Sequence, residues 1–263
     1  MHNFKQNVIL QGMLIVLFLL GIQACKQSKA EENQTYLLQS TSWYQQSAEM
    51  KALYYQAFNW AEILLKEKTR VKSEKPQAVV LDIDETVLDN SPSTACQIIE
   101  DIPFSETLWE DWCSKIEAEA LPGALEFTLY ADKLGVEVFY ISNRVEILSK
   151  YTIANLEKLG FPNADSIHIL LKNDTSSKDL RREIVREKYD IILFIGDNLG
   201  DFDGSFDKRT NDIAKKLVKE RSDRFGTEYI ILPNPMYGSW ERPFRTGDGT
   251  QTENKVSALK SFR

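Results

Sequence analysis

The fold of this chain is decided by one stretch, Val79-Val80-Leu81-Asp82-Ile83-Asp84-Glu85-Thr86-Val87-Leu88. A short apolar run, residues 78–81, breaks off into two aspartates separated by one residue. Buried runs of this kind are typical of interior strands in a parallel sheet. Side chains at i and i+2 share one side of a strand, so both carboxylates can reach one point beyond its end, where open α/β sheets bind ligands. Such close like charges require a cation or a shared proton. A solvated acidic turn is the alternative interpretation.

Composition limits the class of protein. The chain has 263 residues, 43% of them hydrophobic and 11% aromatic, enough for one large domain or a core with a small appended module. Its net charge is −7 and it has no long basic run, which argues against nucleic acid as a partner. Two histidines and three cysteines leave little material for a zinc site.

The N-terminus has the pattern of an export signal. Lys5 precedes an apolar run over residues 8–22, which ends in Gln23-Ala24-Cys25. This ending resembles the bacterial lipoprotein signal, which implies that residues 1–24 are removed and that Cys25 is lipidated. Residues 25–34 then form the tether. We expect an exported lipoprotein anchored to a membrane, with the outer membrane favoured. An uncleaved membrane anchor is the alternative.

The remaining chain predicts alternating helices and strands. Residues 35–75 form an N-terminal helical segment, and residues 76–88 the first core strand with its acidic loop. Residues 89–121 are an insertion without clear strands, which we expect to build a small helical cap together with the N-terminal helices. Residues 122–240 complete a doubly wound parallel α/β sheet, and residues 241–263 are a polar surface tail.

Within residues 122–240 the predicted helices cover residues 124–133, 147–158 and 177–188, and the predicted strands cover residues 136–141, 166–171, 191–195 and 229–232. Reactive side chains follow these strands or begin a helix. Ser142-Asn143-Arg144 follows the strand at 136–141, and Lys178 begins a helix. Asp197 and Asp201 follow the strand at 191–195. Each signal is weak alone, but together with Asp82 and Asp84 they form a specific set.

This set predicts phosphoryl transfer. A carboxylate can attack phosphorus to give an aspartyl-phosphate, and a second carboxyl group can act as the acid and base. Lys178, Ser142 and backbone N–H groups can supply the positive charge and donors that phosphoryl oxygens need. Mg²⁺ prefers oxygen ligands, and loops rich in carboxylates suit it.

The motifs Asp82-Ile83-Asp84-Glu85-Thr86, Ile141-Ser142-Asn143-Arg144, Ser177-Lys178 and Gly196-Asp197-Asn198-Leu199-Gly200-Asp201-Phe202 resemble those of the haloacid dehalogenase (HAD) superfamily. More narrowly, they resemble its class C acid phosphatases, the 5′-nucleotidase lipoprotein family, over residues 35–242. The resemblance implies a HAD-like Rossmannoid core and a Mg²⁺-dependent acid phosphatase that hydrolyses phosphate monoesters, with nucleoside 5′-monophosphates as the expected substrates.

The same resemblance implies roles for individual residues. Asp82 would be the nucleophile and Asp84 the acid/base, while Ser142 and Lys178 would hold the phosphoryl group. The metal would be bound by Asp82, the Asp84 backbone carbonyl and Asp197, with Asp201 orienting metal waters or Lys178. Asn143 and Arg144 would orient substrate or the neighbouring acids. Trp109 and Tyr237 would clasp a nucleoside base, although Trp112 lies close to Trp109 in sequence and either aromatic could instead be a packing residue.

The sequence is also compatible with two other functions. The same cleft could belong to a non-catalytic surface lipoprotein that binds a nucleotide-like ligand, but such a protein needs no acid/base aspartate. A haloacid dehalogenase or phosphonatase is the third class, and Asp84 argues against dehalogenation, because a halide leaving group needs no proton. Cys96 and Cys113 could form a disulfide in an oxidising compartment, which sequence spacing alone does not decide. The oligomeric state is not predicted.

Overall fold

In the computed structural model, residues 33–207, 209–246 and 249–262 are described. Cys25 and the predicted export signal lie outside these residues. The chain divides into two compact units, of which Gln34–Pro243 is the larger and carries every predicted catalytic residue. The smaller unit includes Phe244–Arg263. Among the described residues, no helix is both long enough and apolar enough to cross a membrane.

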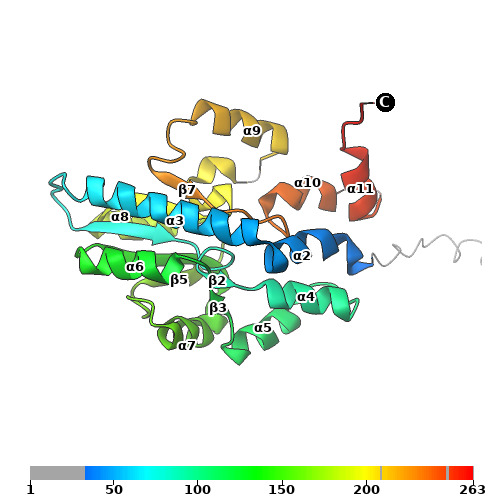
Figure 1. The fold of residues 1–263 in the computed structure, drawn as a ribbon, viewed down its shortest axis with the longest axis horizontal. Coiled ribbons are helices and arrows are strands. Elements are labelled where there is room, and N and C mark those ends of the chain that lie inside the picture. The colour runs from blue at the N-terminus through cyan, green and yellow to red at the C-terminus, as the bar shows by residue number, and fades with distance from the viewer. Residues whose placement is uncertain (1–32, 208, 247–248, 263) are drawn as a thin grey trace, which may run out of the picture. The chain divides into compact units, whose positions relative to one another are not determined.

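A five-stranded parallel sheet forms the centre of the larger unit, in the order β5-β4-β1-β6-β7. Its strands are β1 (Gln77–Leu81), β4 (Glu137–Val145), β5 (Ile169–Lys172), β6 (Asp190–Gly196) and β7 (Tyr229–Ile231). The first predicted strand, β1, is therefore the central one. Parallel strands joined by helices confirm the predicted α/β fold (Figure 1).

Helices cover both faces of this sheet. The α-helices of the larger unit are α2 (Leu38–Gln46), α3 (Ala48–Lys68), α4 (Ser91–Ile99), α5 (Glu106–Lys115), α6 (Ala124–Lys133), α7 (Ser149–Leu159), α8 (Asp179–Lys188) and α9 (Asn211–Glu220). Short 3-10 turns lie at η1 (Gln34–Leu37), η2 (Glu146–Leu148), η3 (Leu199–Asp201), η4 (Gly204–Phe206) and η5 (Ser239–Glu241). The C-terminal segment contains α10 (Arg242–Arg245) and α11 (Gln251–Ser257).

Alternation along β1 explains why both faces are covered. Val79 and Leu81 belong to one buried cluster, which includes Phe58 of α3 and Phe127 of α6. Figure 1 shows α3 and α6 side by side over this face. Ala78 and Val80 point the other way, into a second cluster that α8 joins through Val185. A strand buried on both faces has no polar alternation, as the apolar run at 78–81 predicts.

The insertion after β1 is helical. It holds α4 and α5, and its ends pair as the two-residue strands β2 (Leu88–Asp89) and β3 (Glu119–Ala120). Ser105 caps α5 by accepting a hydrogen bond from the backbone N–H of Leu108 at 3.1 Å. Cys96 lies half-buried in α4 and Cys113 is buried in α5, and both are free thiols. The disulfide left open by the sequence is not formed.

Candidate active site

The predicted site residues converge at the carboxyl edge of the sheet. Asp82 directly follows the central strand β1, and Asp197 directly follows its neighbour β6. Ser142 lies in β4 on the other side of β1, within the strand rather than in the loop predicted after it. Lys178 comes immediately before α8, in the N-cap position. Four separate segments of sequence therefore deliver side chains to one place.

Asp82 forms a buried ion pair with Lys178. Its Oδ1 lies 2.7 Å from Lys178 Nζ, which also lies 2.7 Å from Oδ1 of Asp201. The backbone fixes Asp82 as well, because its N–H donates to the carbonyl of Ile195 in β6 at 3.0 Å. Burial opposes the charge on Lys178, but Asp201 and Asp82 outweigh it and raise the pKa of the ammonium. Lys178 thus remains a cation at the centre of the site.

Three carboxylates crowd around that cation. One oxygen from each of Asp82, Asp197 and Asp201 lies within 4.8 Å of the others. Burial raises the pKa of Asp82 to about 7, with further contributions from Asp201 and Asp84 that Lys178 partly offsets. Burial also raises the pKa of Asp197, together with the charges of Asp201 and Asp82.

The donor set fits a divalent cation. If all three carboxylates are ionised, the one ammonium of Lys178 leaves two negative charges uncompensated, which one divalent cation would balance. Hard cations take carboxylate oxygens as ligands. Both oxygens of Asp201 already have partners, since Oδ1 faces Lys178 and Oδ2 accepts the backbone N–H of Asn198 at 2.8 Å. In Asp82, by contrast, Lys178 and the backbone N–H of Ile83 both contact Oδ1, and Oδ2 has no hydrogen-bond partner among the described residues. The oxygens of Asp197 contact only the neutral side chains of Thr86 and Asn234. Asp82 and Asp197 are therefore the better candidates for direct ligands.

Close approach of the backbone shapes the loop after β6, residues 197–201. A Cβ added at Gly196 would lie 2.3 Å from Oδ2 of Asp201 and 2.6 Å from its Cβ. Glycine is therefore required where β6 ends, because any side chain there would displace Asp201. Asp197 is held by Thr86 Oγ1 at 3.3 Å on one oxygen and by Asn234 Nδ2 at 2.9 Å on the other.

Asp84 has a different environment from Asp82. Its Oδ2 accepts a hydrogen bond from Ser142 Oγ at 3.1 Å. Its Oδ1 accepts from Arg144 Nε and from Asn90 Nδ2, each at 2.9 Å. Arg144 is 2% exposed in its side chain, so the pair is well shielded from water. Asp82 thus pairs with a lysine, whereas Asp84 pairs with an arginine.

The predicted aromatic residues lie at the insertion and at the loop after β7. The half-buried Trp109 of α5 lies under Arg144, whose Cζ is 5.4 Å from the ring centroid. Tyr237 is half-buried against the larger hydrophobic cluster, and its N–H donates to Asn234 Oδ1 at 3.3 Å. Trp112 instead donates its indole N–H to Asn90 Oδ1 at 2.9 Å. Trp112 is therefore linked to Asp84 through Asn90, which hydrogen-bonds to both residues.

Several supporting residues escape prediction from the sequence. Asn143 Oδ1 accepts from Arg181 Nη2 at 2.8 Å, and Arg181 also donates to the carbonyl of Ser142. Arg182 donates to the carbonyls of Gly200 and Asp201 at 2.9 and 2.8 Å. Both arginines lie in a highly charged helix, where such residues normally face solvent. Their spacing with Val185 is the one available signal that this face of α8 is buried.

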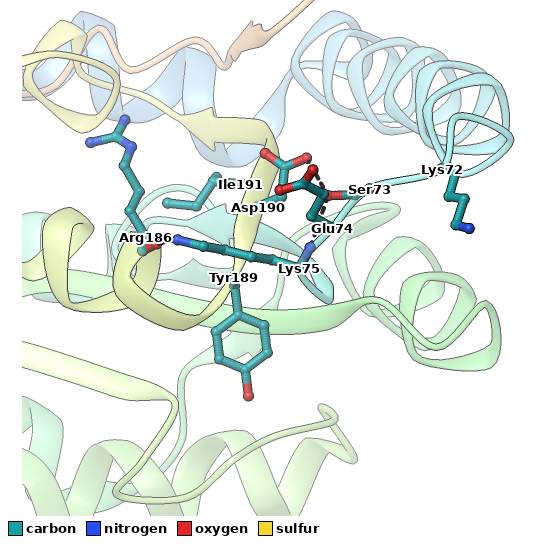
Figure 2. Close-up of a pocket in the computed structure, with 8 residues that line it drawn as sticks. All are labelled: Lys72, Ser73, Glu74, Lys75, Arg186, Tyr189, Asp190 and Ile191. Carbon is teal, nitrogen blue, oxygen red and sulfur yellow. Dashed lines mark hydrogen bonds between the residues drawn. The ribbon is translucent and has the colours of Figure 1, made fainter.

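A cavity of about 560 Å³ lies elsewhere, beside the start of β6 and the segment that precedes β1. In Figure 2 the side chains of Lys72, Arg186 and Tyr189 point away from one another. Lys75 Nζ donates a hydrogen bond to the carbonyl of Arg186 at 2.6 Å. Because parallel sheets bind ligands at the opposite edge, and because these groups do not converge, this cavity is not a candidate active site.

Residues 19–240 match the family described as HAD superfamily, subfamily IIIB (Acid phosphatase). The chain belongs to this family. Two solved structures of a class C acid phosphatase from Bacillus anthracis share 42% sequence identity with the chain, one with tungstate bound and one described without it. The match to the tungstate-bound structure has a TM-score of 0.84 and covers 88% of this chain and 99% of the other.

Plant proteins are also similar to the chain. A stem 31 kDa glycoprotein of Glycine max is 32% identical over 164 residues, and acid phosphatase 1 of Solanum lycopersicum is 27% identical over 169 residues. The chain spans 58% and 57% of the length of these two relatives. The comparisons confirm the family predicted from the motifs and support the predicted enzyme class, a phosphoric monoester hydrolase.

Proposed function

We propose that this HAD acid phosphatase hydrolyses phosphate monoesters through a phosphoryl group carried on Asp82, with Mg²⁺ as its cofactor. The observation that carries the proposal is the pairing of Asp82 with Lys178 at 2.7 Å, with Asp197 and Asp201 beside them. A buried carboxylate next to a fixed cation is positioned to attack phosphorus and to release it again. The tungstate bound by the Bacillus anthracis relative, a tetrahedral oxyanion, agrees with a site for phosphate.

The reaction divides between the two aspartates. One oxygen of Asp82 bonds to phosphorus while the bond from phosphorus to the leaving oxygen breaks, and Asp84 gives its proton to that leaving oxygen. A water molecule then attacks the phosphorus, its proton passes to Asp84, and the bond to Asp82 breaks. Asp84 ends the cycle protonated, as it began. Lys178 and Ser142 would donate to the phosphoryl oxygens.

Asp82, Asp197 and the backbone carbonyl of Asp84 would hold the Mg²⁺, and Asp201 would orient Lys178 and metal-bound water. When bound, the ion supplies positive charge that favours ionised Asp82 and neutralises the phosphoryl group. The uncompensated charge of the carboxylate cluster supports this assignment.

Nucleoside 5′-monophosphates are the proposed substrates. Trp109 lies half-buried beside Arg144, which contacts the proposed acid/base Asp84, so this ring is close to the proposed catalytic residues. Tyr237 would approach from the loop that Asn234 fixes to Asp197. Stacking on such rings is worth about 1–3 kcal/mol per base and is tolerant of base identity. Asn143 and Arg144 would orient the substrate.

Export and a lipid anchor at Cys25 complete the proposal. The signal-like N-terminus supports it, and the outer membrane is the proposed location. Growth of producing cells with a radiolabelled fatty acid would test it, because the wild-type chain should incorporate label and Cys25→Ser should not. Label in both chains would contradict this assignment.

The catalytic proposal is tested with Asp82→Asn. This change keeps the volume of the side chain and removes the nucleophile, so we expect phosphatase activity to fall to background with Mg²⁺ present. Asp190→Asn is a matched control, because Asp190 starts β6, away from the site, and is exposed. It should retain wild-type turnover. Appreciable turnover by purified Asp82→Asn would contradict the proposal.

A further inference from the structure

Asn90 is a buried amide at the junction of the insertion and the active site. It is 1% exposed and immediately precedes α4. Its backbone N–H donates to Glu85 Oε1 at 2.8 Å, which fixes it to the loop after β1. No sequence motif drew attention to it, since an asparagine before a helix is normally an end cap. Its side chain accepts no hydrogen bond from a backbone N–H of α4, so it has another role.

Every polar group of the Asn90 side chain has a specific partner. Nδ2 donates to Asp84 Oδ1 at 2.9 Å and to the carbonyl of Leu88 at 3.3 Å. Oδ1 accepts from Trp112 Nε1 at 2.9 Å and from Arg144 Nη2 at 3.1 Å. The two acceptors and the two donors leave one orientation for the amide, because turning it over would oppose oxygen to oxygen and nitrogen to nitrogen.

This arrangement distinguishes the two oxygens of Asp84. Oδ1 faces Nε and Nη2 of Arg144 and Nδ2 of Asn90, all of which are donors without a free lone pair. A proton on Oδ1 would point at another proton. Oδ2 faces the hydroxyl of Ser142, which can accept as well as donate. Of the two oxygens of Asp84, Oδ2 is therefore the one beside a group that can accept a hydrogen bond, and it lies on the side of the predicted phosphate-binding hydroxyl.

We infer that Asn90 is a positioning residue that, with Arg144, fixes Oδ1 of Asp84 and so directs Oδ2 toward the leaving oxygen of the substrate. The inference rests on the proposed function, in which Asp84 is the acid/base. In the first step the proton on Oδ2 moves to the leaving oxygen as its bond to phosphorus breaks. In the second step Oδ2 takes a proton from the attacking water.

The same residue connects this proton transfer to the insertion. Trp112 holds Asn90 from α5, the helix that also carries Trp109. Arg144 contacts both Asp84 and the ring of Trp109. A change in the position of α5 would therefore alter the hydrogen bonding of Asp84 Oδ1, which is linked to Trp112 through the two hydrogen bonds of Asn90.

The test is the dependence of kcat/KM on the leaving group, measured with alkyl phosphates, phenyl phosphate and 2,4-dinitrophenyl phosphate. General acid catalysis contributes about 10²–10⁴-fold where the leaving oxygen needs a proton. We expect Asn90→Ala to lower kcat/KM for alkyl phosphates by about tenfold or more. The value for dinitrophenyl phosphate should change far less, because dinitrophenolate leaves without a proton. A merely structural residue would lower all values in parallel.

Asn155→Ala is the matched control. Asn155 is another buried amide, 3% exposed, and holds the backbone of Ala118 through bonds of 3.2 and 2.8 Å. Its loss should cost stability without steepening the dependence on the leaving group. A parallel loss across all esters in Asn90→Ala would overturn the inference and leave the proposed function intact. A wild-type chain that hydrolyses none of these esters would overturn the proposed function and the inference together.

Where Asn90→Ala does not fold, Trp112→Phe decides. This change keeps an aromatic ring and removes one donor to Asn90 Oδ1, so it should steepen the same dependence to a smaller extent. Its control is Trp60→Phe. Trp60 lies on the surface of α3, and this change removes its indole hydrogen bond of 2.8 Å to the carbonyl of Gly226. Equal slopes for Trp112→Phe and the wild-type chain would then overturn the inference.

Discussion

In the proposed mechanism Asp82 has to lose a proton before it can attack phosphorus, and its surroundings oppose that loss. Burial raises its pKa to about 7, and the charges of Asp201 and Asp84 add to the effect. Lys178 at 2.7 Å favours the ionised form but is shared with Asp201. One lysine therefore does not compensate the cluster, and a divalent cation would supply what is missing. The proposed chemistry at this residue should therefore depend on metal binding.

Asp197→Asn tests that coupling. A neutral amide is a poorer ligand for a hard dication, so the Mg²⁺ concentration for half-maximal activity should rise by about tenfold or more. Excess Mg²⁺ should restore part of the rate, because Asp82 and Lys178 are untouched. Titration of phosphatase activity with Mg²⁺ measures this, with Asp190→Asn as the control. An unchanged Mg²⁺ dependence would remove Asp197 from the coordination shell.

Trp109→Ala tests the recognition of the base. Removing the ring should raise KM for nucleoside monophosphates by about 5- to 150-fold, the equivalent of about 1–3 kcal/mol of lost stacking. A small alkyl phosphate should keep its KM, because it does not extend to the ring. Trp60→Ala is the control, since Trp60 is an exposed tryptophan of α3. An equal rise for both substrates would show that Trp109 is a packing residue.

At the scale of elements, α8 is the part that joins the loops of the site. It begins directly after Lys178, and its first turns carry Arg181 and Arg182. Arg181 binds the Ser142–Asn143 segment of β4, whereas Arg182 binds the Gly200–Asp201 backbone after β6. The helix α8 thus fixes β4 and the loop after β6 relative to Lys178 at its N-terminus. A polar helix face is buried here because it satisfies loop carbonyls.

Arg182→Met should lower the stability of the fold and displace the loop after β6 that carries Asp197 and Asp201. Arg182 is 1% exposed, and its removal leaves two carbonyls without these donors, at a cost of about 1–3 kcal/mol each. We expect the free energy of unfolding to fall by about 2–4 kcal/mol in urea titrations, and Mg²⁺ affinity to weaken. Arg186→Met in the same helix, whose ion pair is largely exposed, should cost less than about 1 kcal/mol. Similar losses in both variants would contradict the role of Arg182.

The strands were predictable from the sequence for a physical reason. A strand buried on both faces needs an unbroken apolar run, and the runs at 78–81 and 191–195 lie within β1 and β6. Their order along the chain then places Asp82 and Asp197 at one edge. Less was predictable where polar residues support the site. Asn90 contacts Trp112 of α5 and Arg144 of β4, and Arg182 contacts the backbone after β6. Local sequence gives no sign of these partners.

The helices α9 and α11 were also missed. The tail after residue 240 reads as polar, yet α11 forms there with a capping box between Thr250 and Glu253. The helix α9 has no buried residue, although Thr210 caps it at 3.4 Å. The helix α11 forms from an end cap and local bonds rather than from core packing, so hydrophobic periodicity does not reveal it. In α9, by contrast, Ile213, Leu217 and Val218 recur at helical spacing, a pattern that does predict a helix.

At the scale of the whole molecule, the fold stabilises an arrangement of charges that is unfavourable without a cation. The carboxylates of Asp82 and Asp197 lie at the carboxyl edge of the sheet, beside strands packed on both faces. Burial raises the pKa of both. The packed core therefore holds the acids together against their mutual repulsion. It follows that stability, pH and metal should be linked in this protein.

That linkage gives a prediction with a definite sign. For Asp82 the folded pKa of about 7 lies above its ordinary value of 3.8, so the folded chain binds this proton more tightly than the unfolded chain does. The contribution to stability is complete below about pH 4 and is lost as pH rises to about 7. Without a divalent cation, Tm should fall by about 5 °C or more over this interval. Mg²⁺ should raise Tm more at pH 7 than at pH 5, because it binds the ionised cluster.

Asp82→Asn separates this cause from general charge effects. The neutral amide cannot ionise, so the cation-free variant should be more stable than the wild-type chain at pH 7 and should lose less Tm between pH 4 and pH 7. Mg²⁺ should stabilise it less, since one ligand is gone. Thermal unfolding of both proteins with chelator and with Mg²⁺ measures all three effects. A cation-free variant that is less stable than the wild-type chain at pH 7 would show that the Asp82–Lys178 pair stabilises the fold by more than burial and repulsion oppose it.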